Sequence, residues 1–344
     1  QQQLSPFDQG RRQYEGGKYA RALELFGQAI KKSPDSATKN KAYYFQGLVL
    51  FELGYYYSSF EAFKNVLQTT DDQYKELYEK AIKNAVILSD KLDQTASVGK
   101  LLKRFPPSLI PGSVSGITHY AVGVYEYETG DSENAMSHLK SVNPENQFYS
   151  KALVYLGALA TKKKDYKEAV FYFEKAVQLN AGKRDTYSQA ELARLNLART
   201  LYSMGDIERS VETYAQFLSS SPHWLTVLLE ASWPLMRAND TTVSLGNLHT
   251  VTSPYYREDL VGEAYILRAT ILYSLCKYEE MRRTLAAFMS IYDPVFRSMQ
   301  AEQNSLGSPD AYFTALHDKK GINRSFVNYA MRDEGIQKSI RVYN

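Results

Sequence analysis

Several kinds of residue are scarce in this chain of 344 residues, and each scarcity narrows the class of protein. The one cysteine, Cys276, excludes an intramolecular disulfide, so cysteine usage does not fix the redox compartment. The 11 prolines and 19 glycines are too few for a disordered chain and cluster where turns are expected. No apolar run approaches the roughly 18 residues that a membrane-spanning helix needs. The composition therefore indicates a folded chain without an integral membrane segment.

An excess of charge of one sign is also missing. The formal net charge is +3, and basic residues alternate with acidic ones along the chain. The longest basic run, Lys162-Lys163-Lys164, falls in a predicted turn between helices, where a solvated surface is the simplest interpretation. A surface that follows nucleic-acid phosphates needs many cations with few acids among them. We therefore expect no nucleic-acid partner.

Aromatic residues, by contrast, are abundant (28 Tyr and 15 Phe), and they belong to a pattern that repeats. One copy contains Gly157, Tyr166, Ala169, Phe173 and Ala176. Comparable copies, recognised from a glycine or alanine equivalent to Gly157, contain Gly10, Gly47, Gly123, Ala198 and Ala269.

This pattern resembles the tetratricopeptide repeat, a helix-turn-helix unit of about 34 residues. Successive copies are 37, 76, 34, 41 and 71 residues apart, and two of these steps are double. We therefore expect a degenerate copy in residues 74–106 and another in 225–254, the latter with Asn239-Asp240 as its turn. The resemblance implies an all-α fold: a right-handed α-solenoid of about eight helix pairs over residues 5–293.

The small residues of the pattern have a physical role. A helix pair cannot bury its own apolar face, so neighbouring pairs supply the core. Ala169 and Ala176 are expected where helix axes come closest, with Phe173 filling the space between them. A larger side chain there would overpack the contact. Glycines such as Gly17 and Gly54 are expected in the turns within pairs, and Cys276 occupies the same turn position.

Gaps in the pattern divide the chain into expected parts. Residues 5–106 form an N-terminal array, 107–116 a break rich in proline and glycine, and 117–293 a C-terminal array. The pattern stops after Pro294, so residues 294–344 are expected to be a loop followed by one amphipathic helix over 325–342. That helix is interpreted as a cap on the end of the solenoid; the alternative is the start of a further segment.

The sequence contains no recognisable motif for catalysis, metal binding or phosphate binding. The five histidines have no second His or Cys at the spacing that places two metal ligands on one helix face. Cys276 has no implied histidine partner, and glycine-rich phosphate loops and nucleophile elbows are missing. We therefore expect no catalytic residues, no metal, no cofactor and no enzymatic activity.

The resemblance also implies where a partner would bind, because such solenoids present their first helices on a concave surface. Tyrosine suits this role because it offers a large contact area with little entropy to lose, although aromatic residues there also pack adjacent helices. Leu48, Val124 and Thr270 share this surface. The expected partner-binding residues are Arg11, Tyr14, Tyr44, Phe51, Tyr120, Tyr127, Lys162, Arg199, Tyr202 and Tyr273.

A weaker resemblance involves the segments EASWPL (230–235), LGNLHTVTSPYY (245–256) and ILYSLCKYEE (271–280). These are similar to envelope-associated repeat proteins of predatory and gliding bacteria. The N-terminal residues Gln1-Gln2-Gln3-Leu4 suit either a trimmed sequence or a mature exported protein, so a periplasmic location is favoured over a cytoplasmic one.

Three hypotheses for function follow. The first is a scaffold that binds a protein or peptide segment in its groove, within an envelope assembly. The second is a regulatory module gated by a ligand and inhibited by its own C-terminal helix. The third is a protein that binds glycan or peptidoglycan, because tyrosine-lined grooves also stack on sugar rings.

Overall fold

The computed structural model describes residues 4–68, 74–180, 187–259, 261–331 and 333–343. Within these ranges the chain is helical and contains no strand, so the predicted all-α class is confirmed. No helix in the described ranges has the length and apolar character needed to cross a membrane. The chain divides into two compact units, residues 1–189 and 190–344.

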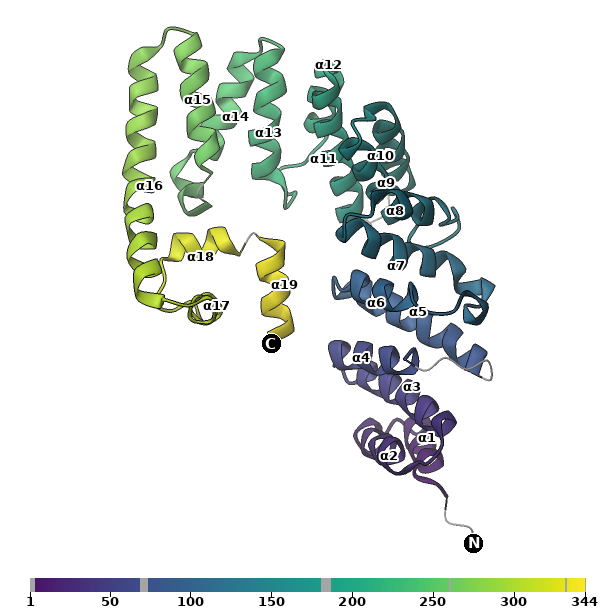
Figure 1. Ribbon diagram of the computed structural model, residues 1–344. Helices are drawn as coiled ribbons and strands as arrows, with labels where there is room; N and C mark the ends of the chain where they lie inside the picture. The colour runs from purple at the N-terminus through teal and green to yellow at the C-terminus, as the bar shows by residue number, and fades with distance from the viewer. Residues whose placement is uncertain (1–3, 69–73, 181–186, 260, 332, 344) are drawn as a thin grey trace. The chain divides into compact units, whose positions relative to one another are not determined.

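Unit 1 consists of five helix pairs stacked in sequence order (Figure 1). In each pair the first helix packs against the second, and each second helix leads into the next pair. The pairs are α1 (Pro6–Glu15) with α2 (Tyr19–Lys32), α3 (Ser36–Glu52) with α4 (Tyr56–Val66), α5 (Lys75–Lys91) with α6 (Thr95–Leu102), α7 (Ser115–Glu128) with α8 (Ser132–Lys140), and α9 (Tyr149–Lys162) with α10 (Tyr166–Asn180).

Unit 2 contains the other three pairs, and the unit boundary falls near the start of its first helix. The eight pairs expected from the sequence are therefore present, with the degenerate copies as α5/α6 and α13/α14. The pairs are α11 (Tyr187–Met204) with α12 (Ile207–Ala215), α13 (Trp224–Arg237) with α14 (Thr241–Val251), and α15 (Gly262–Ser274) with α16 (Tyr278–Leu306).

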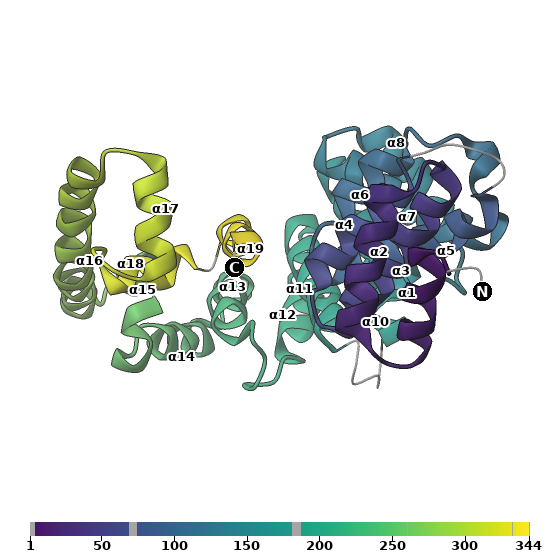
Figure 2. The ribbon, with the colours of Figure 1, turned by 90° about the horizontal axis from the view of Figure 1, so that it is seen from below.

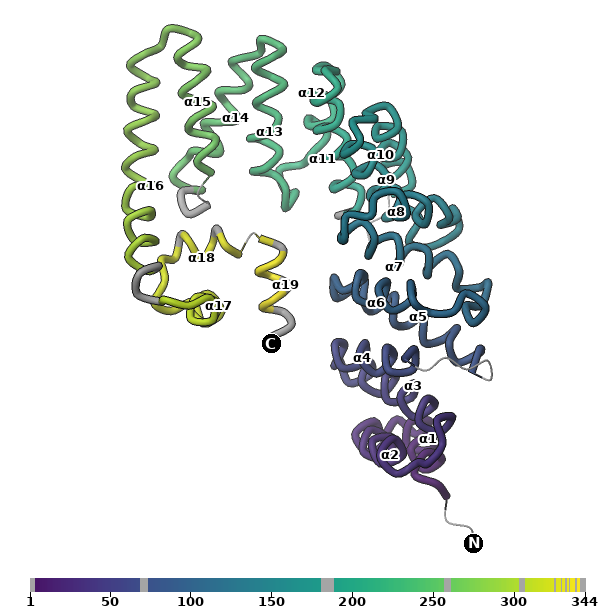
Figure 3. The backbone as a smooth tube through the Cα atoms, viewed as in Figure 1, coloured from purple at the N-terminus to yellow at the C-terminus, as the bar shows by residue number. Residues whose placement is uncertain are grey.

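The same tight turn closes all eight pairs (Figure 3 shows the backbone path). One residue has a positive φ, and the next amide donates to the carbonyl five residues earlier, as Asp165 does to Ala160 at 2.9 Å. This is the Schellman closure, which supplies donors to the last carbonyls of a helix. The positive-φ residues, with φ from 54° to 90°, are Gly17, Gly54, Asp93, Gly130, Lys164, Gly205, Asn239 and Cys276.

Small residues lie at the close contacts within pairs, as the sequence predicted. A β-carbon added to Gly157 would lie 2.6 Å from the nearest ring atom of Phe173. Ala169, Ala176 and Phe173 are all buried on the facing helix. Equivalent contacts are Gly10 with Phe26 at 2.9 Å, Gly47 with Phe63 at 2.7 Å, and Gly123 with Leu139 at 2.7 Å.

The expected break does not separate the two units. Residues 107–116 lie inside unit 1 and form two single 3₁₀ turns, η2 (Pro107–Leu109) and η3 (Gly112–Val114). The turn η3 packs against α5 and α7, so this segment connects two stacked pairs.

The prediction for residues 294–344 was wrong in two respects. First, α16 continues through Pro294 as a helix of 29 residues. A proline inside a helix removes the amide that would donate to the carbonyl four residues earlier, here that of Ser290, so the helix continues without this hydrogen bond. Second, three helices follow it instead of one. They are α17 (Pro309–Asp318), α18 (Arg324–Ala330) and α19 (Glu334–Tyr343).

These C-terminal helices form a small cluster of their own. Leu316, Val327 and Ala330 make its buried centre, and Ile336 of α19 packs against it. Helices α17 and α18 contact α16, and α18 also contacts η5 (Pro254–Asp259). Figures 1 and 2 both show α17 and α18 beside the C-terminal end of α16. The cluster does not cover the length of α16, so the interpretation as a cap on the solenoid end is not supported.

Candidate functional site

The first helices of successive pairs form a layer within each unit. In unit 1, α1, α3, α5, α7 and α9 contact one another in order, and in unit 2 α13 contacts α15. The partner-binding residues expected from the sequence all lie on first helices. We call this layer the first-helix surface of each unit.

Half-buried tyrosines bridge neighbouring first helices. The ring of Tyr14 on α1 lies 5.9 Å from that of Phe45 on α3, and Tyr127 on α7 lies 5.0 Å from Tyr155 on α9. In unit 2 the guanidinium of Arg237 lies 5.4 Å from the ring centre of Tyr202. These side chains pack the layer and remain partly exposed.

The hydroxyls of Tyr14 and Tyr44 remain protonated at neutral pH, because the pKa of each is raised above its usual value. Burial raises the pKa of Tyr14, and the nearby carboxylate of Glu52 raises it further. Burial also raises the pKa of Tyr44, whose ring lies 5.7 Å from Phe63. Neutral hydroxyls both donate and accept hydrogen bonds, which suits a peptide backbone.

Five predicted residues are more exposed. Phe51 is 42% exposed and Tyr273 is 62% exposed, while Lys162 lies at the end of α9. The two arginines already have carboxylate partners within their units. Arg11 lies 3.2 Å from Glu15, and Arg199 makes two hydrogen bonds to Glu230, at 2.7 and 2.8 Å.

Tyr120 is a correction to the predicted site, because only 2% of it is exposed. Its ring stacks on Phe148 at 4.6 Å, and its hydroxyl donates to Asp90 at 3.1 Å. Val124, on the same helix, is buried as well. Helix α7 packs against α5 on one side and α9 on the other, so its inner residues belong to the core.

A set of contacts around the carboxylate of Asp90, which the sequence pattern did not predict, joins these three helices. Lys151 on α9 donates to both oxygens of Asp90 on α5, at 2.6 and 2.8 Å, and Tyr120 on α7 donates to the same carboxylate. Lys151 could have been predicted from the sequence, because it lies six residues before Gly157, at a repeat position that faces the first-helix surface. Asp90 lies in a degenerate copy that lacks the marker glycine, so the repeat did not assign it a position.

Unit 2 has a comparable set of cross-helix contacts, which the sequence pattern did not predict either. Glu230 on α13 accepts from Arg199 on α11 and from the hydroxyl of Tyr214 on α12, the latter at 3.1 Å. The indole of Trp233 donates to Glu263 on α15 at 3.0 Å. These contacts hold the first helices together, and Trp233 lies partly exposed among them.

A buried carboxylate lies elsewhere in unit 1. Glu126 is fully buried, with one oxygen 2.8 Å from the amine of Lys103 and the other 2.6 Å from Nδ1 of His138. The ring of His119 lies 5.4 Å from that of His138, and burial, followed by the nearby His138, lowers the pKa of His119. Nowhere in the described ranges are three or more His, Cys, Asp or Glu side chains placed to hold a metal ion.

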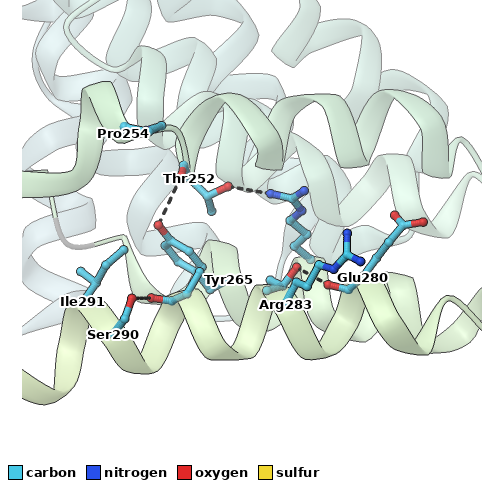
Figure 4. A pocket seen from close by; sticks show the side chains of 10 residues that line it. Thr252, Pro254, Tyr265, Glu280, Arg283, Ser290 and Ile291 are labelled. Carbon is cyan, nitrogen blue, oxygen red and sulfur yellow. Dashed lines mark hydrogen bonds between the residues drawn. The ribbon is translucent and has the colours of Figure 1, made fainter.

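A pocket of about 430 Å³ lies in unit 2 beside α15 and α16 (Figure 4). Thr252 accepts from Arg268 at 3.1 Å through its hydroxyl and from Tyr265 at 3.3 Å through its carbonyl. Arg283 and Glu280 of α16 also line it. Opposite charges share this pocket, so its lining does not define one class of ligand.

The family comparisons agree with this geometry. Three segments match models of the tetratricopeptide repeat: residues 7–72, 150–182 and 192–223. They correspond to α1–α4, α9 with α10, and α11 with α12. No curated protein sequence matches the chain.

Solved structures give matches of low identity. A signal transduction ATPase with a tetratricopeptide repeat sensor, from Pyrococcus horikoshii, is 14% identical with a TM-score of 0.53; the match covers 83% of this chain and 45% of that one. The C-terminal part of a repeat-containing protein from Cytophaga hutchinsonii is 16% identical with a TM-score of 0.45, covering 71% and 93%. A tetratricopeptide repeat protein from Parabacteroides merdae is 15% identical with a TM-score of 0.34, covering 83% and 91%.

The repeated helix pairs, their shared turn and the three matched segments define the class. The chain contains tetratricopeptide repeats in these three segments, and its other helix pairs close with the same turn. Such repeats are generally modules of protein–protein interaction, with stacked pairs that present an extended surface.

Proposed function

We propose that the chain is a non-enzymatic scaffold that binds a segment of a partner protein on the first-helix surface of unit 1. One observation carries this proposal: Phe51, a large aromatic side chain on a first helix, is 42% exposed. Tyr44 lies seven residues earlier on α3, and therefore on the same helix face, and is half-buried. Exposed aromatic area beside hydroxyl groups favours a peptide with apolar side chains.

The proposed ligand follows from the chemistry of this surface. The rings of Tyr14, Tyr44 and Phe51 supply apolar contact, and the tyrosine hydroxyls can bond to backbone amides and carbonyls. Arg11, at the edge, is 52% exposed and is held only by an exposed pair with Glu15, which contributes little energy and can be exchanged. We therefore expect a segment with apolar residues and an acidic residue near the α1 end.

Site-specific photo-crosslinking tests this proposal. A photoreactive phenylalanine at position 51 is expected to capture a discrete partner from native extract. The matched control is position 171, because Phe171 is 57% exposed but lies on the second helix α10 of the same unit. The proposal fails if position 51 captures nothing, or captures the same proteins as position 171.

Substitution provides a second test. Phe51→Ser is expected to weaken capture at least tenfold, which corresponds to about 1.4 kcal/mol, and Phe171→Ser should leave it unchanged. Muropeptide titration distinguishes the glycan hypothesis: we expect no saturable binding, and saturable binding lost in Phe51→Ser would favour that hypothesis instead.

We further propose that this scaffold belongs to a bacterial envelope assembly. The support is the sequence resemblance in residues 230–280. Fractionation of the native host would test it, with the protein expected in the periplasmic or envelope fraction. A purely cytoplasmic pool would refute this part of the proposal without affecting the partner surface.

A further inference from the structure

The last repeat differs from the other seven in the burial of one equivalent position. This is the second-helix residue sixteen positions after the glycine-equivalent residue. In the first seven pairs it is at most 4% exposed, whereas Leu285 in the eighth is 37% exposed. The buried equivalents are Phe26, Phe63, Leu102, Leu139, Phe173, Tyr214 and Leu248.

The cause of the difference is a missing neighbour. The following first helix packs on the second helix in the earlier pairs, as α3 does on α2 and α15 does on α14. Helix α16 has no such successor, and the C-terminal cluster contacts it near Glu302, which accepts from the amide of Asn323 at 2.9 Å. Most of the outer face of α16 is therefore left open.

Apolar residues form a straight stripe along that face. Tyr278 is 50% exposed, Leu285 37%, Met289 53% and Phe296 58%. At about 100° per residue, all four lie within roughly 20° of one line along the helix. The stripe spans 18 residue steps, or about 27 Å at 1.5 Å per residue. Four large apolar side chains in one line are typical of a helix–helix contact.

The order of the four residues is self-complementary. Tyr278 and Phe296 are each nine residues from the level of residue 287, and Leu285 and Met289 are each two residues from it. An antiparallel copy of α16 would therefore place Tyr278 against Phe296 of the second copy, and Leu285 against Met289 of the second copy. Such a contact has two-fold symmetry, the commonest symmetry of homo-oligomers.

The charges beside the stripe fit the same arrangement. Arg282 and Asp293 lie on one side of it, five and six residues from the level of residue 287. In an antiparallel pair, this side of one helix faces the same side of the other, so each Arg282 meets Asp293 of the second copy. Both now make exposed intrahelical pairs, Arg282 with Glu279 at 3.3 Å and Asp293 with Arg297 at 2.8 Å. Exposed pairs of this kind are weak and can be exchanged.

We propose that the open face of α16 is a dimer interface for a second copy of this chain, packed antiparallel along the stripe Tyr278, Leu285, Met289 and Phe296. A contact of one helix pair is at the small end of protein interfaces, so the dimer dissociates on dilution. We expect a Kd of roughly 1–100 µM.

Sedimentation equilibrium from about 1 to 200 µM tests the interface across the expected Kd range. The wild-type chain is expected to convert from monomer to dimer, and Met289→Glu is expected to remain monomeric because two buried carboxylates would enter the contact. Phe171→Glu is the control, an equally exposed aromatic on α10 that should dimerise as the wild type does. Circular dichroism of each variant checks that the fold is intact.

Charge reversal tests the antiparallel arrangement. Asp293→Arg is expected to weaken the dimer at least tenfold, and adding Arg282→Asp should restore it, because the exchanged charges again face one another. A monomeric wild type at 200 µM overturns the proposal, as does a Met289→Glu chain that still dimerises, or assembly beyond dimers. Loss of the dimer in Met289→Glu without rescue in the double charge variant overturns the antiparallel arrangement.

Discussion

Gly157 and Phe173 are in such close contact that a β-carbon on the glycine would stand 2.6 Å from the ring. The two residues join α9 to α10, and Phe173 is 1% exposed, so its ring has no free space to move into. The same relationship links Gly10 to Phe26 and Gly47 to Phe63. The absence of a side chain on the first helix thus determines how closely the pair can pack.

Gly157→Ala should therefore destabilise unit 1. The added methyl group overpacks the contact, which costs about 1–3 kcal/mol. The urea midpoint of the far-ultraviolet circular dichroism transition is expected to fall. Gly27→Ala is the control, since Gly27 lies inside α2 with no atom within 4 Å of an added β-carbon. Gly27→Ala should raise the free energy of unfolding by about 0.5–1 kcal/mol, and the urea midpoint should rise with it. An equal fall of the midpoint in both variants would contradict the close-contact argument.

Lys164→Gly should stabilise the chain. Lys164 closes α9/α10 with a φ of 62°, a conformation that glycine adopts without strain. We expect a gain of about 0.5–1 kcal/mol, measured by thermal or urea unfolding. Lys163→Gly is the matched control: its φ is −77°, so glycine there gives no relief and should slightly destabilise. Equal effects at both positions would show that the turn is not strained.

The Asp90–Lys151 pair should couple α5 to α9. Lys151→Met removes the cation from a carboxylate whose side chain is only 19% exposed, and should cost about 1–3 kcal/mol. Asp90→Asn should cost less, because the amide still accepts from Tyr120. A double-mutant cycle on urea midpoints measures the coupling, and strictly additive effects would mean that the ion pair contributes nothing.

Stability should fall on mild acidification. The pKa of His119 is lowered, first by burial and then by His138, so the unfolded chain takes up the proton first. Neutral His119 therefore contributes stability at pH values above about 6.5, and this is lost as the pH falls through and below that value. Each tenfold difference in proton affinity between the folded and the unfolded chain changes the free energy of unfolding by about 1.4 kcal/mol.

Urea midpoints at pH 7.5 and 5.5 measure this effect, and His119→Asn should reduce the difference between them. His249→Asn is the control, because His249 lies exposed on α14 in unit 2. An unchanged slope in His119→Asn would show that other groups cause the pH dependence.

The local pattern of the sequence determined the helix pairs and their turns. Asn239 and Cys276 take the positive φ that glycine takes elsewhere, in the positions that the repeat assigned to them. A pair folds from contacts between residues close in sequence, so small residues, aromatics and turn residues at fixed spacing were sufficient. The pattern placed small residues at the close contacts between helices and Phe173 between Ala169 and Ala176, whereas the contact of Phe173 with Gly157 came from the structure.

Only the tertiary structure decided which side chains of the first-helix surface are accessible. Tyr120 and Tyr127 occupy comparable pattern positions, yet Tyr120 is buried and Tyr127 is not, because burial depends on how neighbouring helices pack. Asp90 and Lys151 form an ion pair although they are 61 residues apart in the sequence. The repeat pattern does not specify which charged residues stand opposite each other in different copies. The open face of α16 likewise depends on where the C-terminal helices pack. The repeat pattern determines each helix pair, and the neighbours of each pair determine which of its side chains remain exposed.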